Sequence, residues 1–284
     1  VAETLGILQS YTLFGKDSDQ YELAKAIVQR AGANLEKSLF PLFVQLGIWE
    51  ENENLDLLRL DVPLEFSAEC LRWSERLRSA PPPFTGAPVR RDLTHLPLLT
   101  IDGQATLDYD DALSLEDLGD RYRLGIHIAD VGHYVKRDDP IDREAAARGS
   151  SIYTADRKIP MIPPDLAEGL CSLRAGELRP AISVMATLSR SGSLLDYEIF
   201  PSTVAVTRQL SYYEANLMAD TDPAIGTLVF LAEAFRRNRL ENGALQITLP
   251  EINIWLDESG EITLNRINRE SPSRMMVAEL MILG

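Results

Sequence analysis

Residues 99–112 read LTIDGQATLDYDDA, and this stretch decides how the rest of the chain is interpreted. Its two ends are apolar and continue into apolar neighbours, which is typical of short buried strands. Between these ends stand four aspartates, namely Asp102, Asp108, Asp110 and Asp111. Carboxylates set among buried strands need a partner, and a metal ion is the simplest one. The stretch therefore predicts a candidate metal site among strands.

Crowded ionised carboxylates repel one another unless a proton or a cation lies between them. Sites made only of oxygen ligands select hard cations, so we expect Mg²⁺, with Mn²⁺ as the other possibility. A calcium loop requires glycine at its sixth position and glutamate at its twelfth, and frames that begin at Asp102 or Asp108 lack both. An acidic surface turn without any ligand remains the alternative.

The overall composition is that of a globular protein rather than a disordered one, with 284 residues, 45% of them hydrophobic. The net charge of −15 argues against binding nucleic acid through bulk electrostatics. A polyanion would have to meet a local basic groove, or cations held by the carboxylates. Cys70 and Cys171 are the two cysteines, which excludes a disulfide scaffold and a cysteine zinc site.

The sequence has no run of 18 or more apolar residues, and its first ten residues lack the basic and apolar regions of a signal peptide. We therefore expect no membrane partner and a cytoplasmic location. Because the chain begins with Val1, we also expect that it does not begin at its natural start.

The chain divides into two parts by its pattern. Apolar residues at helical spacing predict helices over residues 21–30, 35–46 and 67–79, joined by glycine turns. We expect a helical accessory domain over 1–79, of the helix-turn-helix or winged-helix kind. Either DNA reading or a packing or RNA-guiding role fits such a unit. The sequence APPPFTGAP at 80–88 predicts a proline-rich linker over 80–95.

Residues 96–284 predict an α+β domain, because strands and helices alternate there without a regular βαβ rhythm. Residues 121–128 alternate as a strand does, and a short glycine turn at 191–192 predicts a hairpin of 182–188 with 194–206. A second hairpin is expected from 252–255, a turn at 258–260, and 262–267. Helices are expected over residues 141–148, 212–219, 225–241 and 271–283.

Three ordered motifs carry a resemblance to a known family. They are TIDGQATLDYDDA from residue 100, LGIHIADVGHYV from residue 124, and DREAAARGSSIYTADRKIPMIPPDLAEGLCSLRAGELRP from residue 142. In motif, order and spacing they resemble the catalytic RNB domain of the ribonuclease II and ribonuclease R exoribonucleases. The match is close from about residue 98 to residue 180 and continues more weakly through NGAL at 242–245 to residue 284.

The resemblance implies 3′-to-5′ hydrolysis of single-stranded RNA to nucleoside 5′-monophosphates with magnesium. It assigns the metal site to Asp102, Asp108, Asp110 and Asp111, and among these we expect Asp110 to organise the attacking water. It assigns Tyr153 to the base at the RNA 3′ end. Both assignments suit the chemistry, because cations assist in-line attack of water on a phosphodiester and an aromatic ring stacks on any base.

Basic residues of the matched region are candidates for a local phosphate groove. We expect substrate contacts from Arg148, Arg157 and Arg174, while Arg143, Lys158 and Arg179 share the same segment. Arg236, Arg237 and Arg239 either extend this groove or form a solvated face. Asp130, His127 and His133 are expected to be structural, although Asp130 could also support the metal site from behind.

The chain departs from the family pattern after the matched region. Family members usually continue into an arginine-rich segment and an OB-fold domain, whereas this sequence stops at Gly284. The paired acidic residues that often follow a valine there are reduced to Val277, Ala278 and Glu279. We therefore expect either one piece of a longer polypeptide or a shortened protein. An exoribonuclease is the leading interpretation and a catalytically impaired RNA-binding relative is the alternative; duplex DNA is not an expected partner.

Overall fold

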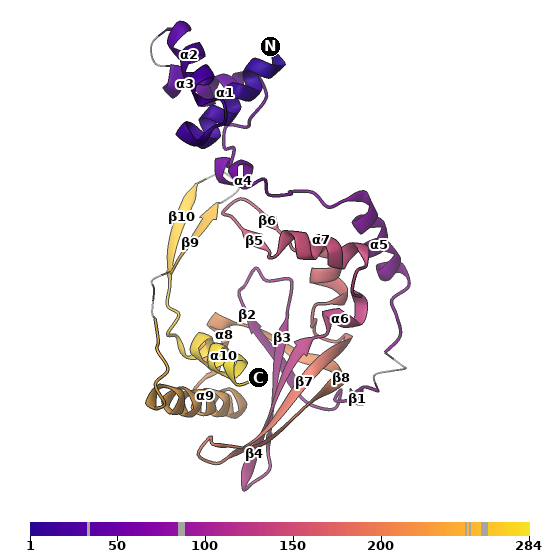
Figure 1. Cartoon of the computed structure of the whole chain (residues 1–284). Coiled ribbons are helices and arrows are strands. Elements are labelled where there is room, and N and C mark those ends of the chain that lie inside the picture. The colour runs from indigo at the N-terminus through magenta and orange to yellow at the C-terminus, as the bar shows by residue number, and fades with distance from the viewer. Residues whose placement is uncertain (33–34, 85–88, 248, 250, 257–260) are drawn as a thin grey trace. The chain divides into compact units, whose positions relative to one another are not determined.

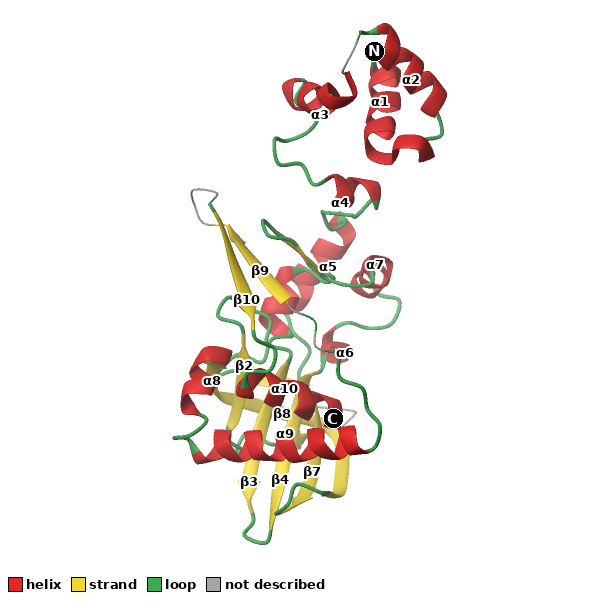
Figure 2. Ribbon diagram, turned by 90° about the vertical axis from the view of Figure 1, so that its left-hand side faces the viewer, coloured by secondary structure: helices red, strands yellow, loops and turns green. Residues whose placement is uncertain are grey.

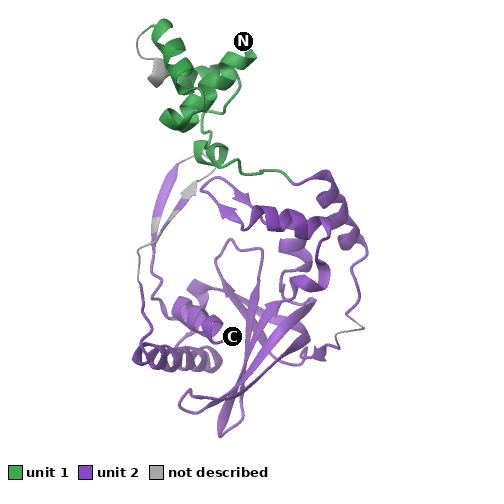
Figure 3. Cartoon of the chain, viewed as in Figure 1, with its two compact units in different colours: residues 1–65 green, residues 66–284 purple. Residues whose placement is uncertain are grey.

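The computed structural model describes residues 1–284 apart from 33–34, 85–88, 248, 250 and 257–260. The chain forms two compact units, Val1–Glu65 and Phe66–Gly284 (Figure 3). None of the described helices is both long enough and apolar enough to span a membrane.

The first unit is helical, as the sequence predicts. Its helices are α1 (Ala2–Phe14), the short 3-10 helix η1 (Gly15–Asp17), α2 (Tyr21–Arg30), α3 (Leu35–Gln45) and α4 (Leu55–Arg59). Leu8, Val28, Leu39, Phe43 and Trp49 are buried together as its core. Helix α1 was not expected, because its apolar residues are not gathered on one face and so show no clear helical period.

Helix α5 (Ala68–Ser79) belongs to the second unit, so the compact units divide before it and not in the expected linker 80–95. Its apolar side packs with parts of the chain that come much later, and Cys70 is buried there with Tyr134, Ile141 and Leu166. A helix whose partners lie in a distant segment cannot be assigned to a domain from local pattern alone. Residues 85–88 of the expected linker lie outside the described residues.

The second unit is built on a mixed sheet, and this confirms the expected α+β class (Figure 1). The strand order is β1-β8-β2-β3-β4-β7, and the long β8 also pairs with β7. The strands are β1 (Arg91–Asp92), β2 (Leu98–Asp102), β3 (Asp111–Asp117), β4 (Arg121–Ala129), β7 (Leu178–Ser189) and β8 (Leu194–Ser211). The first predicted hairpin is therefore confirmed as β7 and β8, which turn at Gly192 with φ 86°.

Helices and two small hairpins complete this unit. The expected helices are confirmed as α7 (Pro140–Arg148), α8 (Tyr212–Met218), α9 (Pro223–Glu241) and α10 (Pro272–Leu283). The short α6 (Val131–Tyr134) and the π-helical turn η2 (Asp165–Leu170) were not predicted. The hairpins are β5 (Ile152–Tyr153) with β6 (Lys158–Ile159), and β9 (Glu251–Leu256) with β10 (Ile262–Ile267). The turn expected at 258–260 falls outside the described residues.

Both faces of the sheet are buried near its centre. Helices α8, α9 and α10 cover one face, where Leu113, Leu124 and Ile126 pack against Leu228 and Leu280 (Figure 2). A second apolar cluster fills the opposite face, with Leu98, Ala112, Met185 and Phe200 among its members. The strand ends that carry the aspartates are thus fixed from both sides.

His127 lies on this second face of β4, where its side chain is completely buried. Its ring nitrogens contact Ser114 Oγ at 2.9 Å and Ser183 Oγ at 2.7 Å, and Ser183 continues the chain to Ser202 at 2.6 Å. Burial lowers the pKa of His127 to about 4, so the ring is neutral at physiological pH. The structural role expected for His127 is confirmed.

Gly125 leaves room for this row of hydrogen bonds between Ser114, His127 and Ser183. A Cβ atom added there would lie 2.3 Å from Ser114 Oγ and 2.5 Å from His127 Nε2. Neither atom can withdraw without breaking a buried hydrogen bond.

We therefore expect Gly125→Ala to lower the free energy of unfolding of the second unit by about 2–4 kcal/mol, from overpacking and a lost buried hydrogen bond. Calorimetry on the whole chain measures this as a lower melting temperature. Gly169→Ala is the matched control, because a Cβ atom there meets nothing within 4 Å. Equal melting temperatures for the two variants would contradict the packing argument.

Candidate active site

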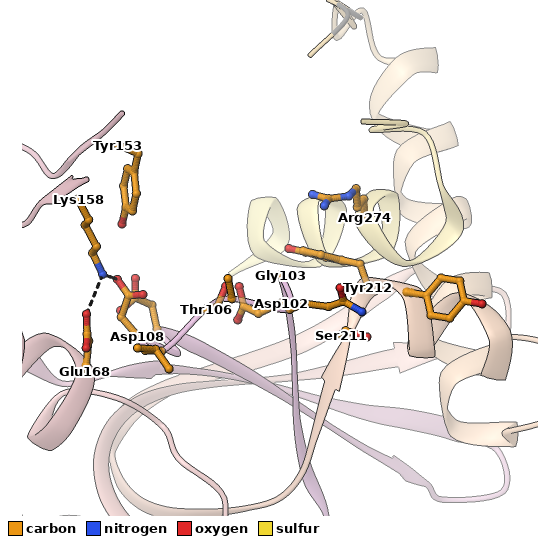
Figure 4. Close-up of a pocket in the computed structure, with 15 residues that line it drawn as sticks. Asp102, Gly103, Thr106, Asp108, Tyr153, Lys158, Glu168, Ser211, Tyr212 and Arg274 are labelled. Carbon is orange, nitrogen blue, oxygen red and sulfur yellow. Dashed lines mark hydrogen bonds and ion pairs between the residues drawn. The ribbon is translucent and has the colours of Figure 1, made fainter. Parts of the chain in front are cut away.

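A cavity of about 760 Å³ opens at the carboxyl end of β2, beside the loop that joins β2 to β3. Its walls come from this loop, the β5–β6 hairpin, η2, the β8–α8 junction and the start of α10. The lining residues are Asp102, Gly103, Gln104, Ala105, Thr106, Leu107, Asp108, Asp110, Tyr153, Lys158, Glu168, Ser211, Tyr212, Tyr213 and Arg274. Figure 4 shows Tyr153 and Lys158 at one end, Tyr212 and Arg274 at the other, and Asp102 and Thr106 between them.

The sheet brings Asp102, Asp108 and Asp110 to the wall of this cavity, whereas Asp111 is not among the described residues that line it. Strand β2 runs parallel to β8 in a register that pairs Asp102 with Ser211, so both strands end at the same edge. Asp111 begins β3, and the intervening loop carries Asp108 and Asp110. The loop is held in place by its backbone, since the Asp110 carbonyl accepts a 2.8 Å hydrogen bond from the Ala129 N–H.

We call Asp102, Asp108, Asp110 and Asp111 the aspartate cluster. Burial, and then the charges of the other three members, raise the pKa of Asp102 to about 7. Burial and then the charge of Asp110 raise the pKa of Asp111 to about 6. Burial and Asp108 likewise raise the pKa of Asp110, which Lys158 partly opposes. Asp102, Asp110 and Asp111 are therefore close enough to neighbouring carboxylates for their ionised forms to be destabilised.

Lys158 supplies a positive charge to one end of the cluster. Its Nζ lies 2.7 Å from Asp108 Oδ2 and 3.4 Å from Glu168 Oε1. The same Nζ is 5.6 Å from the centroid of the Tyr153 ring, which is 67% exposed. An aromatic face open to the cavity and a cation beside it suit a nucleobase and its phosphate.

The donor chemistry of the aspartate cluster fits a hard divalent cation, because all its side-chain ligands are carboxylate oxygens. The charges of the other three aspartates raise the pKa of Asp102, and a bound cation would relieve this repulsion. Within the part of the chain that the structure describes, no three histidine, cysteine or acidic side chains are gathered closely enough to hold a metal ion. Metal binding therefore requires the carboxylates to draw together, and Asp108 to share or leave its contact with Lys158.

The three arginines expected to contact substrate do not meet at this cavity. Among the described residues that line it, none is Arg148, Arg157 or Arg174. The Arg148 side chain is 3% exposed, pairs with Glu144 at 3.2 Å and stacks on the Phe66 ring at 3.9 Å. It thus packs α7 against Phe66, which precedes α5, and its expected contact with substrate stays a prediction. Arg157 pairs with its neighbour Asp156 at 2.9 Å, and Arg174 is partly buried before β7.

Asp130 is structural, as expected. Its side chain forms an ion pair with the nearly buried Arg90 and accepts a hydrogen bond from the His133 N–H at the start of α6. His133 Nε2 lies 3.2 Å from the Pro82 carbonyl oxygen, which gives this residue a structural contact as well.

Sequence reasoning missed several residues of the cavity, above all Glu168, Tyr212, Tyr213 and Arg274. Tyr212 and Tyr213 begin α8 directly after β8, and Arg274 lies in the first turn of α10. The available signal was two adjacent tyrosines at the start of the expected helix 212–219, whereas the parallel pairing of the preceding strand with β2 is visible only in the structure. Nothing local marked Arg274, because its position depends on how α10 packs.

The mixed sheet, its helices and the aspartate-lined cavity are those of an RNB domain, and the chain belongs to the RNB domain family. Residues 90–284 match the RNB domain, and residues 2–55 match a double HTH domain. Both the family expected from the three motifs and a helical N-terminal part of helix-turn-helix type are thereby confirmed.

Two curated relatives illustrate the similarity. The chain is 36% identical over 206 residues to ribonuclease R of Thermotoga maritima, which covers 68% of this chain and 29% of that protein. It is 32% identical over 298 aligned residues to the chloroplastic/mitochondrial ribonuclease II of Arabidopsis thaliana, covering 100% of this chain and 36% of that protein. The chain thus spans about a third of the length of these relatives.

Solved structures share the fold. RNase R of Mycoplasma genitalium in complex with ribose-methylated single-stranded RNA matches with a TM-score of 0.72 and 23% identity, over 80% of this chain and 37% of that one. Yeast Ssd1, described as a pseudonuclease, matches with a TM-score of 0.54 and 18% identity, over 77% of this chain and 26% of that one. The fold is thus shared with a ribonuclease and with a protein described as a pseudonuclease, so activity must be argued from the site.

The aspartate cluster should destabilise the metal-free protein at high pH. Asp102 has a folded-state pKa of about 7 against an ordinary value of 3.8, so stability falls as pH rises between these values. We expect Asp102→Asn to be more stable than the wild type by about 1–2 kcal/mol at pH ~8 with a chelator, after allowance for screening by water, and to lose this advantage near pH ~4.

Denaturant unfolding at the two pH values measures this difference. Asp120→Asn serves as the control, because Asp120 has a side chain 74% exposed and lies away from the cavity. Added magnesium should reverse the order by stabilising the wild type more than Asp102→Asn. A metal-free Asp102→Asn protein less stable than the wild type at the higher pH would refute the repulsion.

Proposed function

We propose that this chain carries the aspartate half of the active site of a 3′-to-5′ exoribonuclease, which hydrolyses single-stranded RNA and releases nucleoside 5′-monophosphates. The observation that carries the proposal is one cavity in which mutually repelling aspartates lie beside the exposed ring of Tyr153. Similarity to proteins named ribonuclease R and ribonuclease II supports the same reaction class. A cytoplasmic location stays a prediction.

Residues of the cavity, together with Asp111 at the start of β3, have separate roles in binding and reaction. The Tyr153 ring stacks on the 3′-terminal base, which requires no particular sequence. Lys158, beside that ring, places a positive charge near the terminal nucleotide. Asp102, Asp108, Asp110 and Asp111 would hold Mg²⁺, or Mn²⁺, which when bound supplies charge to the reacting phosphate and makes water a better nucleophile.

Within this arrangement Asp110 orients the attacking water. Its carboxylate lines the cavity, and burial together with Asp108 raises its pKa, so it accepts a proton more readily than an ordinary aspartate. Its backbone is anchored by the hydrogen bond that the Ala129 N–H donates to the Asp110 carbonyl oxygen.

We expect the wild-type chain, with magnesium and 3′-labelled single-stranded RNA, to release labelled nucleoside monophosphate. Asp110→Asn should slow this release by about 100-fold or more, because it removes an acceptor that acts on the attacking water. Thin-layer chromatography of the label measures the rate, with Asp120→Asn as the matched control. Release that continues unchanged in Asp110→Asn would reject the assigned site.

Tyr153 should act on substrate binding through its ring alone. Tyr153→Ala should raise KM for a short RNA about tenfold, since stacking on one base contributes roughly 1–3 kcal/mol. Tyr153→Phe should leave KM nearly unchanged. Steady-state kinetics give both values, and Tyr197→Ala is the control because Tyr197 is exposed at a distance from the cavity. An equal rise in KM for the Phe and Ala variants would assign the effect to the hydroxyl group.

A catalytically impaired RNA-binding protein is the second candidate, and one observation favours it. Lys158 forms an ion pair with Asp108, and the described carboxylates do not lie close enough together to hold a metal ion. The labelled-RNA experiment decides between the two functions. Binding of RNA without any release, in the presence of magnesium, would favour this candidate.

A further inference from the structure

Two cationic side chains line the described part of the cavity, Lys158 and Arg274, and they differ in whether they form ion pairs with acidic side chains. Lys158 contacts both Asp108 and Glu168. Arg274 stacks on the Tyr212 ring, with 4.1 Å between the guanidinium carbon and the ring centroid. No carboxylate of the described residues forms an ion pair with it. Arg274 is thus the cavity cation with hydrogen-bond donors to spare.

The contact with Tyr212 prepares Arg274 for an anion. A guanidinium that stacks on an aromatic ring keeps its N–H groups at the edge of its plane, where they can meet two oxygens of one phosphate. The side chain is half-buried, which limits the number of orientations that it can take. Figure 4 shows it reaching from α10 over the Tyr212 ring, at the end of the cavity opposite Tyr153.

The position in the helix adds to this charge. Arg274 lies in the first turn of the 12-residue helix α10, whose N-terminus carries a partial positive charge. The Ser271 side chain at the N-cap makes no capping hydrogen bond in the described structure, and the first turn contains no acidic residue. The end of α10 therefore adds positive potential, because the acidic Glu270 just before the N-cap is itself paired with Arg236 at 2.6 Å.

The RNA needs such a charge at this place. The negative charge of the aspartate cluster repels a polyanion that approaches it. When Tyr153 holds the terminal base and the first linkage lies at the aspartates, the chain continues toward the opposite end, where Arg274 lies. The second linkage from the 3′ end is the one that reaches it.

On the basis of the proposed function, we infer that Arg274 binds the phosphate of the second linkage from the RNA 3′ end and so positions the first linkage over the aspartate cluster. Nothing in this role requires Arg274 to react. The other role open to it is to neutralise Asp102, whose pKa its charge lowers. The two roles can be distinguished. If Arg274 only neutralised Asp102, its removal would not change how binding depends on the charge of one particular RNA linkage.

The test measures RNA binding by fluorescence anisotropy, with magnesium, in chains that all carry Asp110→Asn so that the RNA is not consumed. The probes are single-stranded RNAs of one sequence, each with a single uncharged methylphosphonate at the first, second or third linkage from the 3′ end. The variants are Arg274→Met, Arg274→Lys and the control Arg237→Met, which removes an exposed arginine of α9 that does not line the cavity.

With Arg274 present, the uncharged second linkage should weaken binding about tenfold, the size of one charge-assisted hydrogen-bonded contact. Arg274→Met should weaken binding of ordinary RNA by a similar factor, and the uncharged second linkage should then have no further effect. Arg274→Lys should fall between, because a lysine keeps the charge and loses the planar stacked fork. The slope of the logarithm of the RNA-binding constant against the logarithm of the salt concentration should also become less steep by about 0.7 in Arg274→Met.

The inference is overturned by either of two results. In the first, the uncharged second linkage weakens binding equally with and without Arg274; in the second, Arg274→Met binds as Arg237→Met does. The linkage scan on the chain that retains Arg274 needs no substitution at this position, so a folding defect in Arg274→Met cannot hide a negative answer. Loss of all RNA binding by the Asp110→Asn parent would overturn the proposed function too, whereas binding without linkage preference would overturn only this inference.

Discussion

The electrostatic repulsion within the aspartate cluster, of which Asp102, Asp108 and Asp111 are half-buried and Asp110 is exposed, is the constraint on which the site of this chain depends. Burial and neighbouring charge raise the pKa values of Asp102 and Asp111 to about 7 and about 6, which shows that the fold holds these groups together against their electrostatic preference. Such an arrangement persists only where the surrounding structure is rigid. The free energy for it comes from the sheet core, not from the site.

The sheet supplies that rigidity through its register. Asp102 and Ser211 are paired at the ends of two parallel strands, and Asp111 begins the strand on the other side of β2. Apolar clusters cover both faces of the sheet behind them. Neither strand end can relax away from the other without exposing this core, so the repulsion is directed into the cavity, where a cation or a proton relieves it.

Positive charge reaches the cavity from two separate elements. Lys158 lies on the β5–β6 hairpin and forms an ion pair with Asp108, while Arg274 lies on α10 and stacks on the Tyr212 ring. The two cations lie at opposite ends of the row of carboxylates (Figure 4). This gives the site alternating charge, which suits a phosphodiester backbone that must approach acidic groups, and it explains how a chain of net charge −15 can offer a polyanion a place to bind.

The sequence by itself determined the longer helices and strands of the second unit and the acidic half of the site. The hairpin at Gly192, the helix that became α9 and the aspartate loop follow from periodicity, turn residues and one ordered motif, all of which act over short distances along the chain. Only the tertiary structure decided which cations face the aspartates. Lys158 meets Asp108 across 50 positions of sequence, and Arg148, a neighbour in the same motif, turns instead onto Phe66 and Glu144. Similar basic residues in one segment thus acquire different roles, because a side chain's partners are set by packing between distant elements, and that packing leaves no periodic trace in the sequence.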